Sequence, residues 1–323
     1  MSKRLLHSVA VQEIAVAADV ITTNDLAVNP LSVVLICIRP LNETSTLSAY
    51  ARYMEMVGSL NRVTILFRGQ SIFSMPGRDA AALNYCRHGI LPREVNPDDA
   101  DNERRCVVLP ILLGRFAYDP VSCFPASRRG ELALEMDIDV ADTGYDGFRY
   151  SVETVEILGI EPKEYERKTV IGQTMVVGEN NIAMPAGNDI RGVLAFGTTG
   201  FTGAAPAPSL GRVGIYLDNQ QVGYGSSDFE VAAMLGSLLG RQPPGLDLHT
   251  HRVPTNAGAN EETTGPIEQA MGGWENYIFL DTDPTRDDDF SLKTKGSYSF
   301  FLRSTAETAD AVRVVPVERI MVD

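Results

Sequence analysis

The sequence has few aromatic residues, few cysteines and no long apolar run, and each scarcity removes a class of protein. Phe, Tyr and Trp make up 7% of 323 residues, with one Trp, so exposed aromatic rows that stack sugars or bases are not expected. No run of 18 apolar residues occurs, so no transmembrane helix is expected. The cysteines form no CxxC pair and are too few for a disulfide framework, which favours synthesis in a reducing cytoplasm; they are Cys37, Cys86, Cys106 and Cys123.

Positive charge is also scarce. The chain has 28 Lys and Arg against 42 Asp and Glu, a formal net charge of -14. An acidic surface favours solubility and argues against general binding to duplexes, so we predict no sequence-specific nucleic-acid partner. The first twenty residues superficially resemble a signal peptide. Their apolar stretch is interrupted by His7, Gln12, Glu13 and Asp19, so we predict that no such peptide is present.

The usual catalytic signatures are missing. The sequence contains no G-x-S-x-G elbow, P-loop or H-E-x-x-H pair, and no G-x-G-x-x-G follows a strand. The glycine-rich turn GYGSS at 223–227 lacks the Lys of a phosphate loop. We therefore predict no catalytic residue, no cofactor-binding residue and no cofactor, and we expect that the protein is not an enzyme.

The sequence does contain a succession of short strand patterns separated by polar turns. In ELALEMDIDV, residues 131–140, apolar and acidic side chains alternate, which is typical of a strand with one buried face. Many short strands between turns indicate antiparallel sandwiches. The strands expected are Val9–Val16, Ser32–Ile38, Val63–Phe67, Val107–Leu113, Leu132–Ile138, Phe148–Ile157, Thr169–Val177, Gly192–Phe196, Val213–Leu217, Tyr277–Leu280, Ser297–Leu302 and Val312–Val317.

Helix patterns are few and short. Leu47–Val57 places apolar side chains at helical spacing. Asp79–Tyr85 and Asp228–Leu239 each begin with Asp, which is favourable at a helix cap or first turn. The expected class is therefore all-β with a few short helices.

One stretch of the chain is repeated. LNRVTILFRGQSIFSMPGRDAAALNY, residues 60–85, and LGRVGIYLDNQQVGYGSSDFEVAAML, residues 210–235, share six identities at a constant offset of 150. Both stretches predict a strand, a polar turn, a short strand and a small-residue helix. A repeat of about 150 residues is too long for a solenoid unit and indicates two copies of one domain.

A weaker repeat supports the duplication. VITTNDLAVNP at 20–30 resembles VVGENNIAMP at 176–185, and a hydrophobic strand follows each. Between the two copies, IEPKEYERK at 160–168 is polar and has no apolar period, as expected of a linker. We therefore predict one domain over residues 1–163 and another over 164–323.

Two sandwiches of similar length, each with a short helix after its central strands, resemble the double jelly-roll major capsid proteins of tailless icosahedral viruses. Some of these viruses are bacteriophages and many contain an internal membrane. The resemblance lies in NRVTILFRGQSIFSMPGRDAAAL, in GRVGIYLDNQQVGYGSSDFEVAAML and in the late stretch WENYIFLDTDPTRDDDFSLKTKGSYSFFLR. It implies two tandem eight-stranded antiparallel jelly rolls, each made of two four-stranded sheets.

The resemblance also implies a function. Three chains would form a homotrimer whose six jelly rolls make a pseudo-hexameric tile of the virion shell. Its partners would be further copies of itself, vertex (penton) and minor capsid proteins, and an internal membrane on the side of the basic N-terminus. The protein would be made in the host cytoplasm. The long loops Arg87–Arg105 and Gly240–Gly273 would lie on the outer surface or between tiles.

Two loops could hold a metal where subunits meet. His249 and His251 would point to the same side of an extended segment, with Asp247 as a third ligand, although a plain polar loop is the simpler interpretation. Asp281–Asp289 contains five aspartates, and oxygen-rich loops hold Ca²⁺, but the pattern lacks the glycine and the closing Glu of an EF-hand, so we favour a solvated acidic turn. We predict no resident metal site and leave these two as alternatives.

Two other functions stay open. Glu131 and Glu135 form a carboxylate pair on one strand that a glycosidase could use, although acidic residues on an exposed strand face are more often there for solubility. In a two-sandwich hydrolase acting on carbohydrate or glycoprotein, the expected acids are Asp281, Asp283 or Glu131. A receptor-binding or lectin-like virion module is the other alternative. Trp274 after two glycines is expected to anchor a returning loop.

Overall fold

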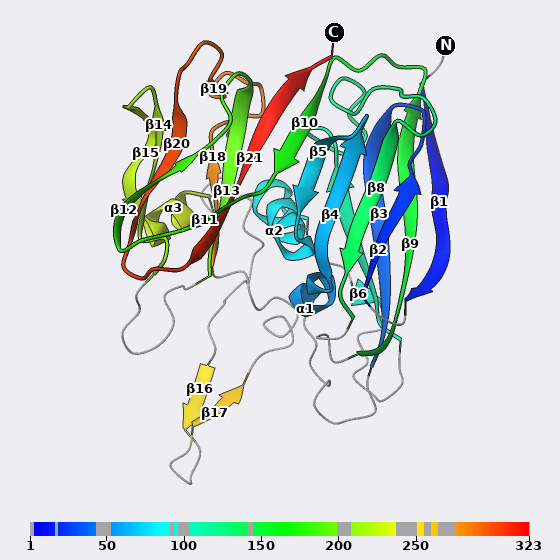
Figure 1. Ribbon diagram of the computed structural model, residues 1–323, viewed down its shortest axis with the longest axis horizontal. Coiled ribbons are helices and arrows are strands. Elements are labelled where there is room, and N and C mark those ends of the chain that lie inside the picture. The colour runs from blue at the N-terminus through cyan, green and yellow to red at the C-terminus, as the bar shows by residue number, and fades with distance from the viewer. Residues whose placement is uncertain are drawn as a thin grey trace.

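The computed structural model describes residues 3–16, 19–42, 53–90, 94–95, 104–140, 145–198, 208–236, 251–254, 260–263 and 276–322. Figure 1 shows two β-sandwiches side by side, with their strands roughly upright and both chain ends at the same end of the molecule. Within the described ranges, no helix is long and apolar enough to cross a membrane.

The first sandwich is built from two antiparallel sheets. One has the strand order β1-β9-β3-β7-β6, and the other contributes β2-β8-β4-β5. The strands are β1 (Arg4–Val16), β2 (Val20–Asp25), β3 (Leu31–Asn42), β4 (Leu60–Phe67), β5 (Gln70–Met75), β6 (Glu94–Val95), β7 (Cys106–Leu112), β8 (Leu132–Ile138) and β9 (Tyr145–Leu158).

The second sandwich repeats this order. One of its sheets has the strand order β11-β21-β13-β18, which corresponds to β1-β9-β3-β7 of the first sandwich. The other sheet has the order β12-β20-β14-β15, which corresponds to β2-β8-β4-β5. The predicted fold of two eight-stranded jelly rolls is therefore confirmed. The strands are β10 (Glu164–Thr169), β11 (Ile171–Thr174), β12 (Gly178–Ala183), β13 (Asp189–Gly197), β14 (Arg212–Leu217), β15 (Gln220–Asp228), β16 (His251–Pro254), β17 (Asn260–Thr263), β18 (Tyr277–Asp281), β19 (Leu292–Lys293), β20 (Phe300–Ala306) and β21 (Ala311–Met321).

The repeat seen in the sequence is a hairpin followed by a helix. β4 and β5 are joined by Arg68-Gly69, and β14 and β15 by Asp218-Asn219, and all four turn residues have positive φ. Such a two-residue turn matches the twist of the flanking strands. The helices that follow are α2 (Gly77–His88) and α3 (Phe229–Gly236).

The helices differ in detail from the sequence predictions. Only α1 (Tyr53–Gly58) of the expected helix 47–57 falls within the described residues. Asp79 does not begin α2. It lies in the first turn, where its side chain makes tertiary contacts instead of a cap. Asp228 is the last residue of β15, so α3 begins one residue later than predicted.

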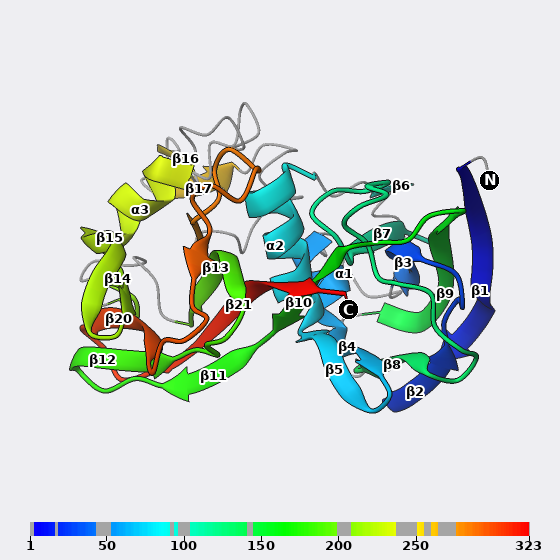
Figure 2. The ribbon, with the colours of Figure 1, turned by 90° about the horizontal axis from the view of Figure 1, so that it is seen from above.

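The predicted linker at 160–168 is wrong for its second half, since only residues 160–163 lie outside the strands. Residues 164–169 form β10, which pairs with β5 of the first sandwich in parallel and with β21 of the second in antiparallel orientation. One ten-stranded sheet therefore runs through both sandwiches, and β10 is its bridge (Figure 2). The absence of apolar alternation misled the prediction, because the alternating buried residues of β10 are charged.

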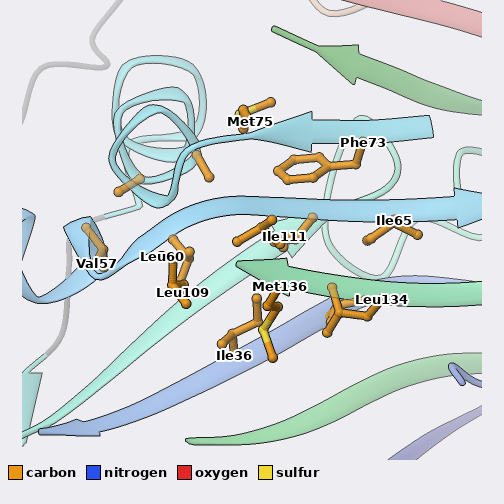
Figure 3. Packing of buried hydrophobic residues seen from close by; sticks show 14 of the residues in the cluster. Ile36, Val57, Leu60, Ile65, Phe73, Met75, Leu109, Ile111, Leu134 and Met136 are labelled. Carbon is orange, nitrogen blue, oxygen red and sulfur yellow. The ribbon is translucent and has the colours of Figure 1, made fainter. Parts of the chain in front are cut away.

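The apolar core of the first sandwich follows the predicted alternation. On β8, Leu132, Leu134, Met136 and Ile138 are buried, and the acidic residues between them are partly exposed. Figure 3 shows Leu134 and Met136 packed among side chains from β3, β4 and β7. This cluster extends into the second sandwich, whose β13, β18 and β21 contribute Leu194, Tyr277, Phe279, Val315 and Val317. The division of the chain at residue 163/164 stays a prediction.

Candidate functional site at the junction of the two jelly rolls

The junction is built around charged side chains of β10. Glu164, Glu166 and Lys168 alternate with Tyr165 and Arg167, so the three point the same way and are buried. A strand with a charged buried face is stable only if every charge has a partner. Those partners come from segments far away in the sequence.

Glu166 lies at the centre of this network. Arg87, in the last turn of α2, donates two hydrogen bonds to its carboxylate. Arg191 of β13 donates a third at 3.1 Å, and the Lys168 ammonium lies 2.9 Å away. Burial alone would raise the pKa of Glu166, but the three cations outweigh burial and hold that pKa well below its usual value.

Burial disfavours the charged form of Lys168, which belongs to the same network. Its Nζ donates to the carbonyl of Leu112 at 2.7 Å and contacts Glu166. Burial nevertheless lowers the pKa of Lys168 to about 8, helped by the neighbouring Arg87 charge and opposed by Glu166. At Lys168 the effect of burial on the pKa therefore exceeds that of the ion pair, whereas at Glu166 the effect of the ion pairs exceeds that of burial.

Arg191 connects β10 to the aspartate loop, residues 281–289. It donates to Glu164, and its Nε and Nη2 donate to the two carboxylate oxygens of Asp288 at 2.8 and 3.0 Å. Arg319 of β21 also donates to Glu164. Burial opposes ionisation of Asp288, but hydrogen bonds from Arg191 and Arg115 lower its pKa to about 2.

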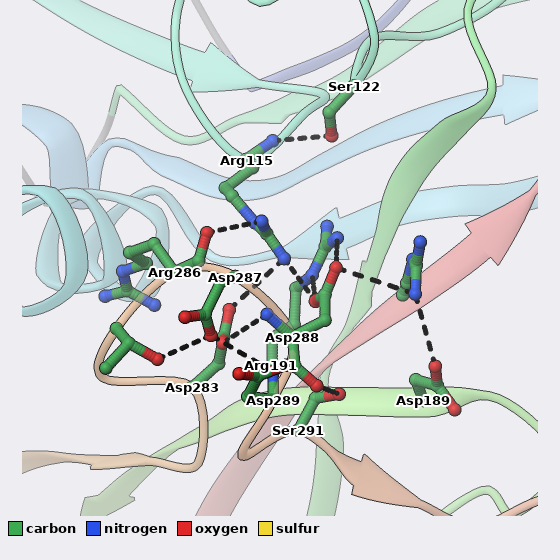
Figure 4. A network of polar contacts seen from close by, with 12 residues as sticks. Arg115, Ser122, Asp189, Arg191, Asp283, Arg286, Asp287, Asp288, Asp289 and Ser291 are labelled. Atoms are coloured by element: carbon green, nitrogen blue, oxygen red, sulfur yellow. Dashed lines mark hydrogen bonds and ion pairs between the residues drawn. The ribbon is translucent and has the colours of Figure 1, made fainter.

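The aspartate loop binds arginines of the first sandwich (Figure 4). Arg115 lies between the carboxylates of Asp283 and Asp288, and donates to the carbonyl of Arg286. Arg286 in turn donates to the carbonyl of Arg87 and to Asp281. The loop is thus a structural part of the junction, which the prediction of a solvated acidic turn missed.

The loop also stabilises its own shape. The backbone N–H of Asp283 donates to Asp281, and that of Asp288 donates to Asp283. Arg286 and Asp288 have φ of 62° and 69°, a left-handed conformation that such side-chain bonds support. Among the residues that the structure describes, no three His, Cys, Asp or Glu side chains are arranged to hold a metal. A Ca²⁺ site at 281–289 stays an untested alternative.

A second set of contacts joins α2 to the other sandwich. Asp79 accepts hydrogen bonds from the Tyr277 hydroxyl at 2.7 Å and from Nε and Nη2 of Arg313 at 2.7 and 2.8 Å. The Arg313 guanidinium lies over the ring of Phe196, 4.1 Å from its centroid. α2 therefore crosses the junction with an acid in its first turn and a base in its last turn, as the helix dipole favours.

The other sequence-predicted residues lie elsewhere. Glu131 precedes β8 beside the turn of the β4–β5 hairpin, where it binds Arg68 and the N–H of Arg128. Glu135 is a partly exposed residue of β8. His249, Asp247, Trp274 and most of the loops Arg87–Arg105 and Gly240–Gly273 fall outside the described residues. His251 begins β16, whose backbone alone is described.

The whole chain resembles solved capsid structures. The major capsid protein P2 from bacteriophage PM2 matches with a TM-score of 0.65 and 10% identity, over 100% of this chain and 98% of that one. The major capsid protein of Sulfolobus turreted icosahedral virus gives 0.65 and 10%, over 98% and 97%. The Faustovirus major capsid protein gives 0.56 and 8%, over 99% and 90%. No family model and no curated sequence matches. At such identities the likeness shows the fold, and it confirms the predicted resemblance at that level.

Proposed function

We propose that this chain is a major capsid protein that forms a pseudo-hexameric homotrimer in the icosahedral shell of a tailless virus. The observation that carries the proposal is the agreement of the entire chain, both sandwiches included, with structures that are named as major capsid proteins. A duplicated sandwich suits this role, because three chains supply six similar edges and can fill a hexagonal position.

The junction supports a rigid tile. Two units, proposed as residues 1–163 and 164–323, share one sheet and a buried charge network, so they keep a fixed orientation. The partners proposed are neighbouring trimers, vertex (penton) and minor capsid proteins, and an internal membrane facing the basic N-terminus. The chain would be made in the host cytoplasm and would reside in the virion. The proposed orientation has the N-terminus facing inward and the segment that contains β16 and β17 facing outward. Figure 1 supports it, since β16 and β17 lie at the end of the molecule opposite the N-terminus.

We also propose that the chain is not an enzyme. Asp283 has no exposed surface and Asp281 is 8% exposed, and both are bound to arginines. A carboxylic acid that protonates a glycosidic bond must reach its substrate, so these residues do not suit the hydrolase alternative. Release of sugar from a glycan panel by correctly folded protein would contradict this part of the proposal. A sugar-binding module would instead be revealed by retention on glycan arrays.

The first test is the mass of the purified chain in solution, measured by light scattering. We expect about 105 kDa, three times the 35.1 kDa of one chain, or a larger assembly. Electron microscopy of the assembled material should then show hexagonal tiles or closed shells. A strict monomer at high concentration would contradict the trimer and with it the capsid proposal.

A further inference from the structure

Two of the four cysteines lie side by side in the first sandwich. The Sγ atoms of Cys37 on β3 and Cys106 on β7 are 3.3 Å apart, although 69 positions separate the two residues in the sequence. Both are free thiols. The sulfur atoms of a disulfide are about 2.0 Å apart, so these two need to approach by only about 1.3 Å to form one.

The register of the sheet explains why the two thiols meet. β3 and β7 are antiparallel neighbours, and Cys37 lies opposite Val108. Cys106 comes two residues before Val108, so its side chain lies on the same face of the sheet as Cys37, on the diagonal. The alternate residues Ile38 and Val107 belong to the apolar core, so the thiols lie on the other face. Figure 2 shows the two strands within the first sandwich.

The two thiols differ in accessibility. Cys106 is partly exposed, whereas Cys37 is 8% exposed. Burial is the largest cause that raises the pKa of Cys37 to about 12, and the contact with Cys106 raises it further. A small reagent therefore meets Cys106 first, and Cys37 is placed to react with whatever Cys106 has bound.

Arg39 brings positive charge to the pair. Its guanidinium donates a hydrogen bond at 2.9 Å to Ser151, the residue opposite Cys37 on β9, and its charge lowers the pKa of Cys37. A cation beside a thiol favours the thiolate, which is the form that attacks a disulfide. Burial and a neighbouring cation thus act in opposite directions on this pair.

The remaining cysteines provide a comparison within the same sandwich. Cys123 is fully buried and Cys86 packs against the apolar cluster from α2. Among the described residues, no other cysteine sulfur contacts either of them. They are therefore inert references for the Cys37–Cys106 pair.

A metal does not explain the pair. A structural zinc site takes four ligands, and soft thiolates are completed by further Cys or His side chains. Within the described ranges, no group of three His, Cys, Asp or Glu is arranged to hold a metal ion. Two thiols in contact and without further ligands suit a dithiol–disulfide pair.

We propose that Cys37 and Cys106 form a reversible disulfide, which stays open in a reducing thiol buffer and closes in an oxidising one. The oxidant is a small disulfide of the glutathione class. The Cys106 thiolate attacks one of its sulfur atoms, forms a mixed disulfide and releases one thiolate. Cys37 then loses its proton to water and attacks the Sγ of Cys106, which releases the second thiolate. Two thiols have been oxidised and one small disulfide has been reduced to two thiols.

The bond would fasten the strand that anchors two parts of the junction. On β7, the carbonyl of Pro110 accepts a hydrogen bond from Asn84 of α2, and that of Leu112 accepts one from Lys168. The edge of β7 away from β3 is paired only with the two-residue strand β6. A disulfide at the beginning of β7 closes a loop of 69 positions, which restricts the unfolded chain and raises stability.

The first experiment counts thiols. The purified chain is reduced, equilibrated with an excess of oxidised glutathione, denatured and titrated with a thiol reagent. We expect the count to fall from four to two, and mass spectrometry of a digest to find Cys37 linked to Cys106 within one chain. An excess of reduced glutathione should restore all four. A folded chain that keeps four thiols, stops at a mixed disulfide, or forms a bond through Cys86 or Cys123 overturns the inference.

The second experiment measures the melting temperature of the oxidised and the reduced protein. We expect the oxidised wild type to melt about 5 °C higher. Cys106→Ser, at the partly exposed position, should fold and melt at the same temperature in both buffers. Cys86→Ser is the matched control, since it leaves the pair intact and should keep the difference. A difference that survives in Cys106→Ser overturns the inference.

The inference and the proposed function can fail separately. Neither readout requires a trimer, so a chain that oxidises as expected but stays monomeric would contradict the proposed function alone. The proposed function would supply the two buffers, because a virion protein made in a reducing cytoplasm meets an oxidising medium after release.

Discussion

Asp79 on α2 accepts two hydrogen bonds from the guanidinium of Arg313, although 234 positions separate the two residues in the sequence. The carboxylate is buried and also accepts the Tyr277 hydroxyl, whereas the Arg313 side chain is 29% exposed. One acid in a helix of the first sandwich thereby fixes two strands of the second.

Asp79→Ala should destabilise the fold by about 3 kcal/mol, because it leaves the buried Tyr277 hydroxyl and the Arg313 guanidinium without their acceptor. Urea denaturation followed by circular dichroism measures this. Asp228→Ala is the control, since the Asp228 side chain is 56% exposed and its pair with Arg212 should contribute at most about 1 kcal/mol. Equal losses in the two variants would contradict the role given to Asp79.

Arg191→Met should cost about 3–5 kcal/mol of unfolding free energy, since it leaves Glu164, Glu166 and Asp288 short of a cation in a buried site. Lys168→Met should cost less, because burial already disfavours its charge and Glu166 keeps two arginines. The same denaturation assay compares them. A larger loss for Lys168→Met than for Arg191→Met would refute this account of the network.

Stability should fall on acidification. The pKa of Glu166 is held well below its usual value and that of Asp288 is lowered from 3.8 to about 2, so the unfolded chain takes up protons before the folded one. The stabilisation is complete above about pH 5 and is lost as the pH falls towards 2. Melting temperatures measured between pH 7 and pH 2 test this. Asp288→Asn should be less stable at neutral pH and should lose less between pH 4 and pH 2.

Gly192→Ala should disturb the ten-stranded sheet that runs through both sandwiches. A Cβ at residue 192 would lie 2.3 Å from the Phe279 ring, which packs directly over this glycine. Moving that ring should cost about 1–3 kcal/mol. Gly172→Ala on β11 is the control, because no atom lies within 4 Å of the added methyl, and it should be neutral or slightly stabilising. Thermal denaturation of both variants decides the point.

The strands with an apolar face could be predicted from the sequence, and the polar ones could not. β7, β8, β9 and β14 follow visible apolar patterns, and the structure places strands there. β2 (VITTND) and β12 (GENNIA) were noticed as a repeat but not as strands, because few of their residues are buried. The strand predicted at Ser297–Leu302 begins at Phe300, after a turn closed by Thr294 and Ser297.

The junction was missed for a different reason. Glu166 resembles a linker residue in the sequence because the cations that make its burial tolerable, Arg87 and Arg191, lie 79 and 25 positions away. Lys168 does so because the carbonyl that accepts its hydrogen bond, that of Leu112, lies 56 positions away. The charged residues of EYERKT do recur with a period of two, which is the period of a strand. This pattern indicates a buried strand face only when the fold is known to place arginines beside it. Likewise, DTDPTRDDD gives no sign that its aspartates face Arg115.

The shared strand β10 has a mechanical consequence. It is held on one edge by five consecutive pairs, Glu164–Lys168 with Val317–Met321, and on the other by two pairs with β5. A force directed along the strands would load the β21 pairs together in shear instead of opening them one after another. The two sandwiches of one chain would then respond to such a force as a single plate.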